Sequence, residues 1–117
     1  MRIDILRDRS KDFALRMVRL FSALPKTAEA QLLGEQALRT GTLAAAHFRR
    51  VSRARSHAEF LAKLALIEQE FDETLLWLEL LMESGLTNAS ELAALRDEAH
   101  EFLKITVTSI KCAKRRI

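Results

Sequence analysis

Residues that interrupt helices are scarce in this chain, which has 3 glycines and 1 proline among 117 residues. Leu, Ala, Glu and Arg, which favour helix, fill the long intervals between them. Hydrophobic residues make up 49% and charged residues 30% of the sequence, a balance typical of globular proteins. The sequence therefore predicts a few long helices around one core, in a single domain that covers residues 1–117.

A small number of capping and stop signals divides the chain into four helical stretches. In chain order, the signals are Ser10, Pro25, Thr27, the Ser56/Glu59 capping box, Gly85 and a second possible capping box at Asn88/Glu91. They predict helices at about 10–24, 27–54, 56–84 and 88–115, with residues 1–9 as an N-terminal arm. Because the connections between these helices are short, consecutive helices should run antiparallel. The sequence therefore predicts an all-α fold, an antiparallel up-down-up-down four-helix bundle.

The predicted helix 56–84 carries two apolar stripes. The main stripe recurs every three or four residues within a sector about 80° wide: Phe60, Leu64, Ile67, Phe71, Leu75, Leu78 and Met82. A second patch, with Trp77, Leu66 and Leu80, lies about 130–150° away. Since a monomeric bundle needs only one stripe, the second patch predicts a subunit interface, where Glu70 and Glu73 meet arginines of a neighbour. The alternative is that Trp77 covers an edge of its own bundle.

The net charge of +3 conceals blocks of opposite sign. Residues 1–57 carry +7, residues 58–103 carry −9 and residues 104–117 carry +5. Because these blocks can pair with one another or with neighbouring subunits, net charge alone is weak evidence for a nucleic-acid partner.

Cations on the outer faces of the second and fourth predicted helices are candidates for binding phosphate. They are Arg39, Arg49, Arg50, Arg53, Lys111, Lys114 and Arg115. The alternative is a solvated or inter-subunit ion-pair face that also stabilises the helix C-termini. Apart from the core-facing Phe48, no aromatic residue interleaves with these cations, so RNA or DNA would be held by its backbone without sequence readout.

Patterns for catalysis, metal binding and membrane insertion are missing from the sequence. Asp97–His100 matches a helicase signature only as letters, because no phosphate-binding loop accompanies it. A di-iron bundle site needs two Glu-x-x-His motifs, and the Asp97/His100 pair has that spacing only once. Cys112 is the only cysteine, and no apolar run approaches the roughly 20 residues of a membrane span. We therefore expect a cytoplasmic protein that is not an enzyme and has no catalytic residues, metal or cofactor.

Two runs in the third predicted helix resemble a known family. Arg53–Ser56 with Glu59 and Phe60, and Asp72–Leu75 with Trp77–Leu81, are similar to proteins encoded by open reading frames in bacterial 23S rRNA intervening sequences. The likeness covers about residues 10–116. It implies a four-helix bundle that assembles into a ring, typically a homopentamer, related to accessory proteins of diversity-generating retroelements. Those proteins bind a reverse transcriptase, and they bind nucleic acid through a basic surface.

The sequence departs from the family pattern at two positions near the end of the second helix. His47 stands where the family usually has Asn, and Arg50 where it often has Glu. We expect a non-enzymatic, homo-oligomeric scaffold or interaction protein, and the resemblance implies a pentameric ring. The alternative is a nucleic-acid-binding accessory protein with basic surface patches, and a separate protein partner is also open.

Overall fold

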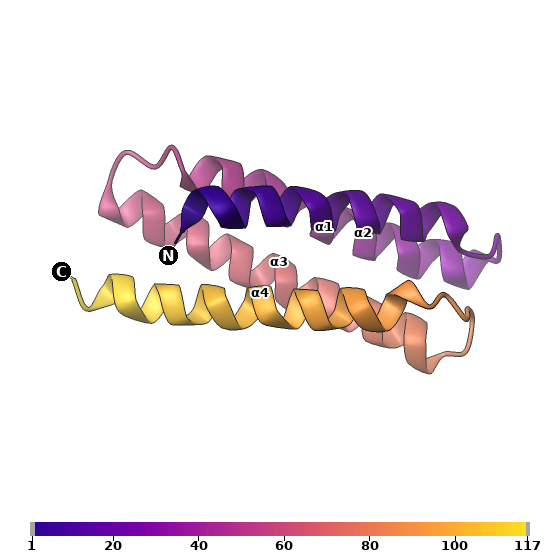
Figure 1. Cartoon of the computed structure of the whole chain (residues 1–117). Coiled ribbons are helices and arrows are strands. Elements are labelled where there is room, and N and C mark those ends of the chain that lie inside the picture. The colour runs from indigo at the N-terminus through magenta and orange to yellow at the C-terminus, as the bar shows by residue number, and fades with distance from the viewer. Residues whose placement is uncertain (1, 117) are drawn as a thin grey trace.

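The computed structural model describes residues 2–116, which form four α-helices. They are α1 (Ile3–Ala23), α2 (Ala28–Val51), α3 (His57–Glu83) and α4 (Glu91–Lys114). Consecutive helices run in opposite directions along a bundle of 48 × 20 × 20 Å (Figure 1). The predicted all-α four-helix bundle is confirmed.

The core is organised around one phenylalanine from each helix. Phe13, Phe48, Phe71 and Phe102 are all fully buried, and we call them the phenylalanine layer. The rings of Phe71 and Phe102 stack with centroids 4.7 Å apart, and Phe13 meets Phe71 edge-on at 5.6 Å. Such aromatic contacts contribute about 0.5–1.5 kcal/mol each beyond the burial of apolar area.

The helices do not all pack equally closely. α2 packs extensively on both α1 and α3, and α3 packs extensively on α4, whereas α1 and α4 meet over a much smaller contact. α1 and α3 therefore lie diagonally across the core and meet mainly through their buried side chains. At the α1–α4 edge, Arg9 pairs with Glu98 at 2.8 Å, and Arg16 pairs with Glu91.

Several predicted helix ends are confirmed by hydrogen bonds. Thr27 caps α2 by accepting a hydrogen bond from the backbone N–H of Ala30. Ser56 caps α3 by accepting one from the backbone N–H of Glu59 at 3.0 Å. Gly85 follows α3 with φ of +72°, a left-handed conformation that glycine adopts without strain, so the helix stops there.

The predicted arm at residues 1–9 is wrong for the described part, because α1 begins at Ile3. Leu6 is buried in the core and Ile3 packs against it, so tertiary packing extends the helix by about two turns. Ser10 is no N-cap. It lies buried inside α1, where its hydroxyl donates to the carbonyl of Arg7 at 2.9 Å.

Two other predicted boundaries shift as well. α2 ends at Val51 rather than 54, because Arg53 and Ala54 donate to carbonyls three residues back, in a tighter turn than an α-helix. α4 begins at Glu91 rather than 88, and the residue at its N-cap position, Ser90, makes no side-chain cap hydrogen bond. The predicted Asn88/Glu91 capping box is therefore absent from the structure.

Gly41 lets α1 approach α2 closely. A Cβ atom at this position would lie 3.1 Å from Met17 Cγ and 3.3 Å from Phe13 Cε2, and both of those side chains are fully buried. Gly34, seven residues earlier, faces Phe21 of α1 and Leu24, which directly follows that helix. The close approach explains why helix-weakening glycines are present inside α2.

We expect Gly41→Leu to lower the free energy of unfolding by roughly 1–3 kcal/mol, because the larger side chain must displace Met17 and Phe13. Chemical denaturation followed by circular dichroism measures the change. Ala28→Leu introduces the same side chain at an exposed position of α2 and should shift stability by less than about 0.5 kcal/mol. Equal effects of the two substitutions would contradict the close-packed α1–α2 contact.

Candidate functional site

Three leucines on the outer side of α3 form an apolar surface. Leu66, Leu76 and Leu80 are 38%, 49% and 39% exposed, and we call them the outer face of α3. Between residues 64 and 83, α3 also holds six acidic residues and no Lys or Arg. The surface is thus apolar with an acidic border.

The structure separates the five residues predicted for a subunit interface. Leu66 and Leu80 lie open on the outer face of α3, and Glu73 is half-buried beside them. Trp77 is half-buried, packs against the core and keeps its Nε1 atom buried without a hydrogen-bond partner. Glu70 is only 9% exposed. Trp77 therefore packs along an edge of its own bundle, and its part in a subunit interface stays a prediction.

Leu76 belongs to this surface but was missed by the sequence analysis, which centred the second patch on Trp77. It lies four residues before Leu80 and ten after Leu66, spacings that keep all three on one side of a helix. The signal in the sequence that could have identified Leu76 is an apolar residue on a side of α3 that is otherwise rich in acids.

His47 and Glu70 form a buried polar pair between α2 and α3. His47 Nδ1 lies 3.9 Å from Glu70 Oε1, and it has no hydrogen-bond partner. Burial lowers the pKa of His47, and the nearby Arg50 and Lys63 lower it further. Burial and the neighbouring Glu73 raise the pKa of Glu70, against the opposite effect of Arg39. His47 is therefore neutral at neutral pH.

The charges separate along the long axis of the bundle. The start of α1, the α2–α3 connection and the end of α4 gather at one end (Figure 1). On that side of the phenylalanine layer, residues 2–12, 49–70 and 103–116 hold 14 Lys/Arg against 6 Asp/Glu, a net charge of +8. Residues 14–47 and 72–101 on the other side hold 5 against 10, a net charge of −5. We call the first part the basic end.

Six of the seven cations predicted to bind phosphate lie at the basic end: Arg49, Arg50, Arg53, Lys111, Lys114 and Arg115. Arg39 lies apart from them, nine residues before Phe48 and so about 13 Å along α2. It donates a hydrogen bond to Gln36 at 3.0 Å. The structure thus groups the candidates and leaves Arg39 outside the group.

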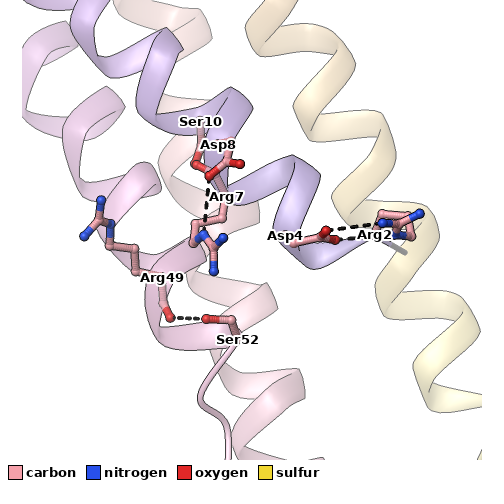
Figure 2. A network of polar contacts seen from close by, with 7 residues as sticks. All are labelled: Arg2, Asp4, Arg7, Asp8, Ser10, Arg49 and Ser52. Carbon is pink, nitrogen blue, oxygen red and sulfur yellow. Dashed lines mark hydrogen bonds and ion pairs between the residues drawn. The ribbon is translucent and has the colours of Figure 1, made fainter.

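Arg7 joins this group, although the sequence analysis placed it in an arm. Arg7, Asp8, Arg49, Ser52 and Arg53 line a hollow of about 300 Å³ between α1 and the end of α2. Figure 2 shows Arg7 and Arg49 on the two facing helices, with the Arg7 Nε atom 3.5 Å from Asp8 Oδ1. In the same figure, the Ser52 hydroxyl donates to the carbonyl of Arg49 at 2.7 Å and closes the last turn of α2.

A second hollow, of about 290 Å³, lies on the neighbouring side of the α2–α3 connection. It is lined by Arg50, Arg53, Arg55, Glu59 and Lys63. Within residues 2–116, none of these arginines forms an ion pair, in contrast to Arg9 and Arg16 at the α1–α4 edge. The arrangement can therefore hold an anion between several guanidinium groups.

Neither a metal cluster nor a membrane helix is found in the part of the chain that the structure describes. Residues 2–116 contain no group of three or more His, Cys, Asp or Glu side chains placed to hold a metal ion. None of the four helices is long and apolar enough to span a bilayer.

The buried state of His47 makes stability depend on pH. Because the folded state lowers the pKa of His47, the unfolded chain binds more protons once the pH falls below about 6.5. The free energy of unfolding then decreases on acidification, with a slope approaching about 1.4 kcal/mol per pH unit. Glu70, whose pKa is raised, acts in the opposite direction as the pH approaches its titration range.

Denaturation at about pH 7.5 and about pH 5.5 tests this effect of His47. His47→Gln should lose less stability between the two pH values than the natural sequence does. His100→Gln, which changes an exposed histidine of α4, should behave like the natural sequence. If His47→Gln keeps the full pH dependence, another group is responsible for it.

Comparison with known proteins agrees with the fold and with the resemblance found in the sequence. The model of a family described as 23S rRNA-intervening sequence protein matches residues 5–108. A solved structure from Bacteroides thetaiotaomicron, a protein of unknown function from the S23 ribosomal protein family, is 31% identical, with a TM-score of 0.84. That match covers 95% of this chain and 99% of the other. No curated protein is significantly similar. This chain belongs to the 23S rRNA-intervening sequence protein family.

Proposed function

We propose that the protein is a homo-oligomeric helical scaffold that acts by binding and not by catalysis. The observation that carries the proposal is the outer face of α3, with Leu66, Leu76 and Leu80 all more than a third exposed. Leu76 and Leu80 lie one turn apart, about 6 Å along the helix, and Leu66 lies about 15 Å before Leu76 on the same side. The three leucines form an apolar strip that Gln69 and Glu73 interrupt. Apolar residues exposed together on one side of a helix are typical of surfaces that bind another protein.

A second copy of the chain is the proposed occupant of this surface. The acidic border of α3 requires a partner with cations beside apolar residues, and the chain has more Lys and Arg than Asp and Glu. The number of subunits in the proposal is five, which the family resemblance implies. A cytoplasmic location is part of the same proposal.

The surface of the basic end also supports a binding role. Its two hollows are lined mainly by arginine and lysine side chains, which hold anions electrostatically, with one acid in each, Asp8 and Glu59. Neither the matched family nor the similar solved structure is described as an enzyme.

Removing the apolar strip should lower the mass of the oligomer. Leu76→Glu combined with Leu80→Glu places two charges on the strip, and we expect a smaller mass in light scattering with unchanged helix content. Ala93→Glu, at an exposed site on α4, serves as the control and should leave the mass unchanged. Trp77→Ala is a less clean test, because Trp77 also packs against its own core. An unchanged mass for the double variant would contradict the scaffold proposal.

Binding of RNA or DNA is a second candidate function, favoured by the charge separation along the bundle. The basic end gathers a net charge of +8 within one end of a molecule whose other end is negative. Phosphate backbones bind such surfaces through Arg and Lys, with strong dependence on salt concentration. In an oligomer, several basic ends contact one polyanion together, which raises the overall affinity.

The triple substitution Arg49→Ala, Arg50→Ala and Arg53→Ala should weaken binding to RNA or DNA in a salt-titrated gel-shift assay. Each lost phosphate contact lowers the slope of log affinity against log salt by about 0.7–0.9. Lys26→Ala with Arg96→Ala removes two cations from the opposite side of the phenylalanine layer and should leave the slope unchanged. The absence of any binding by the natural sequence at low salt would exclude this function.

A further inference from the structure

Arg53 belongs to both hollows of the basic end. In the first hollow, of about 300 Å³, it lies with Arg7 of α1 and Arg49 of α2. In the second, of about 290 Å³, it lies with Arg50 of α2 and Lys63 of α3. Because one side chain lines both, the two hollows are adjacent and meet at Arg53.

Cations outnumber acids in each hollow. The first has three arginines and one acid, Asp8, and the second has four cations and one acid, Glu59. Since Arg53 is shared, the two hollows together hold six cations and two acids, a net charge of +4. Asp8 lies 3.5 Å from Arg7, whereas Glu59 forms no ion pair among residues 2–116. An anion with several negative charges is needed to balance this surface.

The backbone that carries the arginines is held on both sides. The Ser52 hydroxyl donates to the carbonyl of Arg49 at 2.7 Å, and the N–H of Arg53 donates to the carbonyl of Arg50 at 3.0 Å. These bonds satisfy two carbonyls at the end of α2. On the other side, Ser56 caps α3, whose first turn brings the positive end of a helix dipole to the second hollow. The surface is thus organised before a ligand binds.

The buried His47 responds to the positive field of the second hollow. Burial lowers the pKa of His47, and Arg50 and Lys63 lower it further, although Glu70 lies only 3.9 Å away. One cation from α2 and one from α3 therefore act on the same point. An anion bound between them would offset both.

The shape of the guanidinium group indicates which kind of anion fits. Its five N–H donors form a rigid planar fork that can donate along more than one edge. Arg53, with a hollow on either side, can therefore donate to two phosphate groups at once. Phosphates joined through one bridging oxygen are close enough for this, whereas a sugar separates those of a nucleic-acid strand. No aromatic side chain lines either hollow, so bases have nothing to stack on.

We propose that the two hollows around Arg53 form one binding site for an oligophosphate, a chain of two or more phosphate groups joined by bridging oxygens. Arg53 donates to two adjacent phosphates. Arg7 and Arg49 hold the chain in the first hollow. Arg50 and Lys63 hold it in the second. An inorganic chain and a nucleoside diphosphate or triphosphate present the same groups. The site requires neither the proposed oligomer nor binding of RNA or DNA.

Isothermal titration calorimetry with inorganic pyrophosphate and orthophosphate, without divalent cations, tests the site in the full chain. Pyrophosphate should bind at least about tenfold more tightly, because it reaches both hollows. Arg53→Gln should weaken pyrophosphate binding by about tenfold and remove most of the preference, with unchanged helix content because Arg53 is exposed. Arg39→Gln, at an exposed arginine of α2 outside the hollows, is the control and should change neither. Equal affinities for the two anions, or full pyrophosphate binding by Arg53→Gln, would overturn the proposal.

Two further ligands separate oligophosphate binding from general attraction and identify the source of the phosphate chain. Citrate carries several negative charges without bridged phosphates and should bind about tenfold more weakly than pyrophosphate. Equal binding of citrate would contradict the proposal. Equal binding of ATP and inorganic tripolyphosphate would identify the phosphate chain as the whole ligand, and tighter binding of ATP would identify a nucleotide.

Histidine signals in NMR spectra locate the bound anion. Pyrophosphate should raise the pKa of His47, because it offsets Arg50 and Lys63, and should leave the signals of the exposed His100 in place. If pyrophosphate binds and His47 does not respond, the two-hollow site is wrong. Binding of RNA without binding of pyrophosphate would likewise refute the oligophosphate site and leave the nucleic-acid candidate standing. Binding of pyrophosphate without RNA would do the reverse.

Discussion

The phenylalanine layer is the constraint on which the other features of this bundle depend. Each of the four helices contributes one fully buried ring, and neighbouring rings stack, tilt against each other or meet edge-on. Sliding one helix by a turn would move its ring about 5 Å out of the layer and leave a cavity, at a cost of several kcal/mol. The layer therefore fixes the heights of all residues along the helices. The charge separation at the basic end follows from it.

The unequal contacts between the helices explain which surfaces are left open. Gly41 brings α1 close to α2, so α1 buries its apolar stripe there and keeps Leu15 and Val18 outside. On the α4 side, Arg9 bridges to Glu98 and Glu101 and lies over the Phe102 ring at 5.0 Å. This edge is closed by partly exposed ion pairs and one cation–π contact, which are weaker than apolar packing.

The sequence predicted best where a local signal and the tertiary packing agree. The caps at Thr27 and Ser56 and the stop at Gly85 are local, and all three were placed correctly. The start of α1 was missed because Arg2 at its N-cap makes no side-chain cap hydrogen bond. The helix begins at Ile3 because Leu6 is buried in the core, which no local signal in the sequence indicates.

The candidate surfaces also depend on local signals that the sequence shows and on tertiary packing that it does not show. The angular position of Trp77 placed it outside the core stripe, but its long side chain reaches back to pack against the core. Helical periodicity gives the direction of the Cα–Cβ bond and not the reach of the side chain. The grouping of Arg7 with Arg49 and Arg53 could not be predicted either, since it requires α1 to begin at Ile3 and to run beside the end of α2.

The basic end and the proposed ring act on one another through electrostatics. Where the proposed oligomer brings several ends of net charge +8 together, like charges repel and weaken assembly. Salt screens this repulsion at distances beyond about 8–10 Å. A polyanion bound across several basic ends neutralises the repulsion and leaves the apolar contacts of the outer face of α3 in place. By linkage, a ligand that binds the ring more tightly than the single subunit stabilises the ring. The two proposed functions thus reinforce each other, because assembly strengthens polyanion binding and the bound polyanion strengthens assembly.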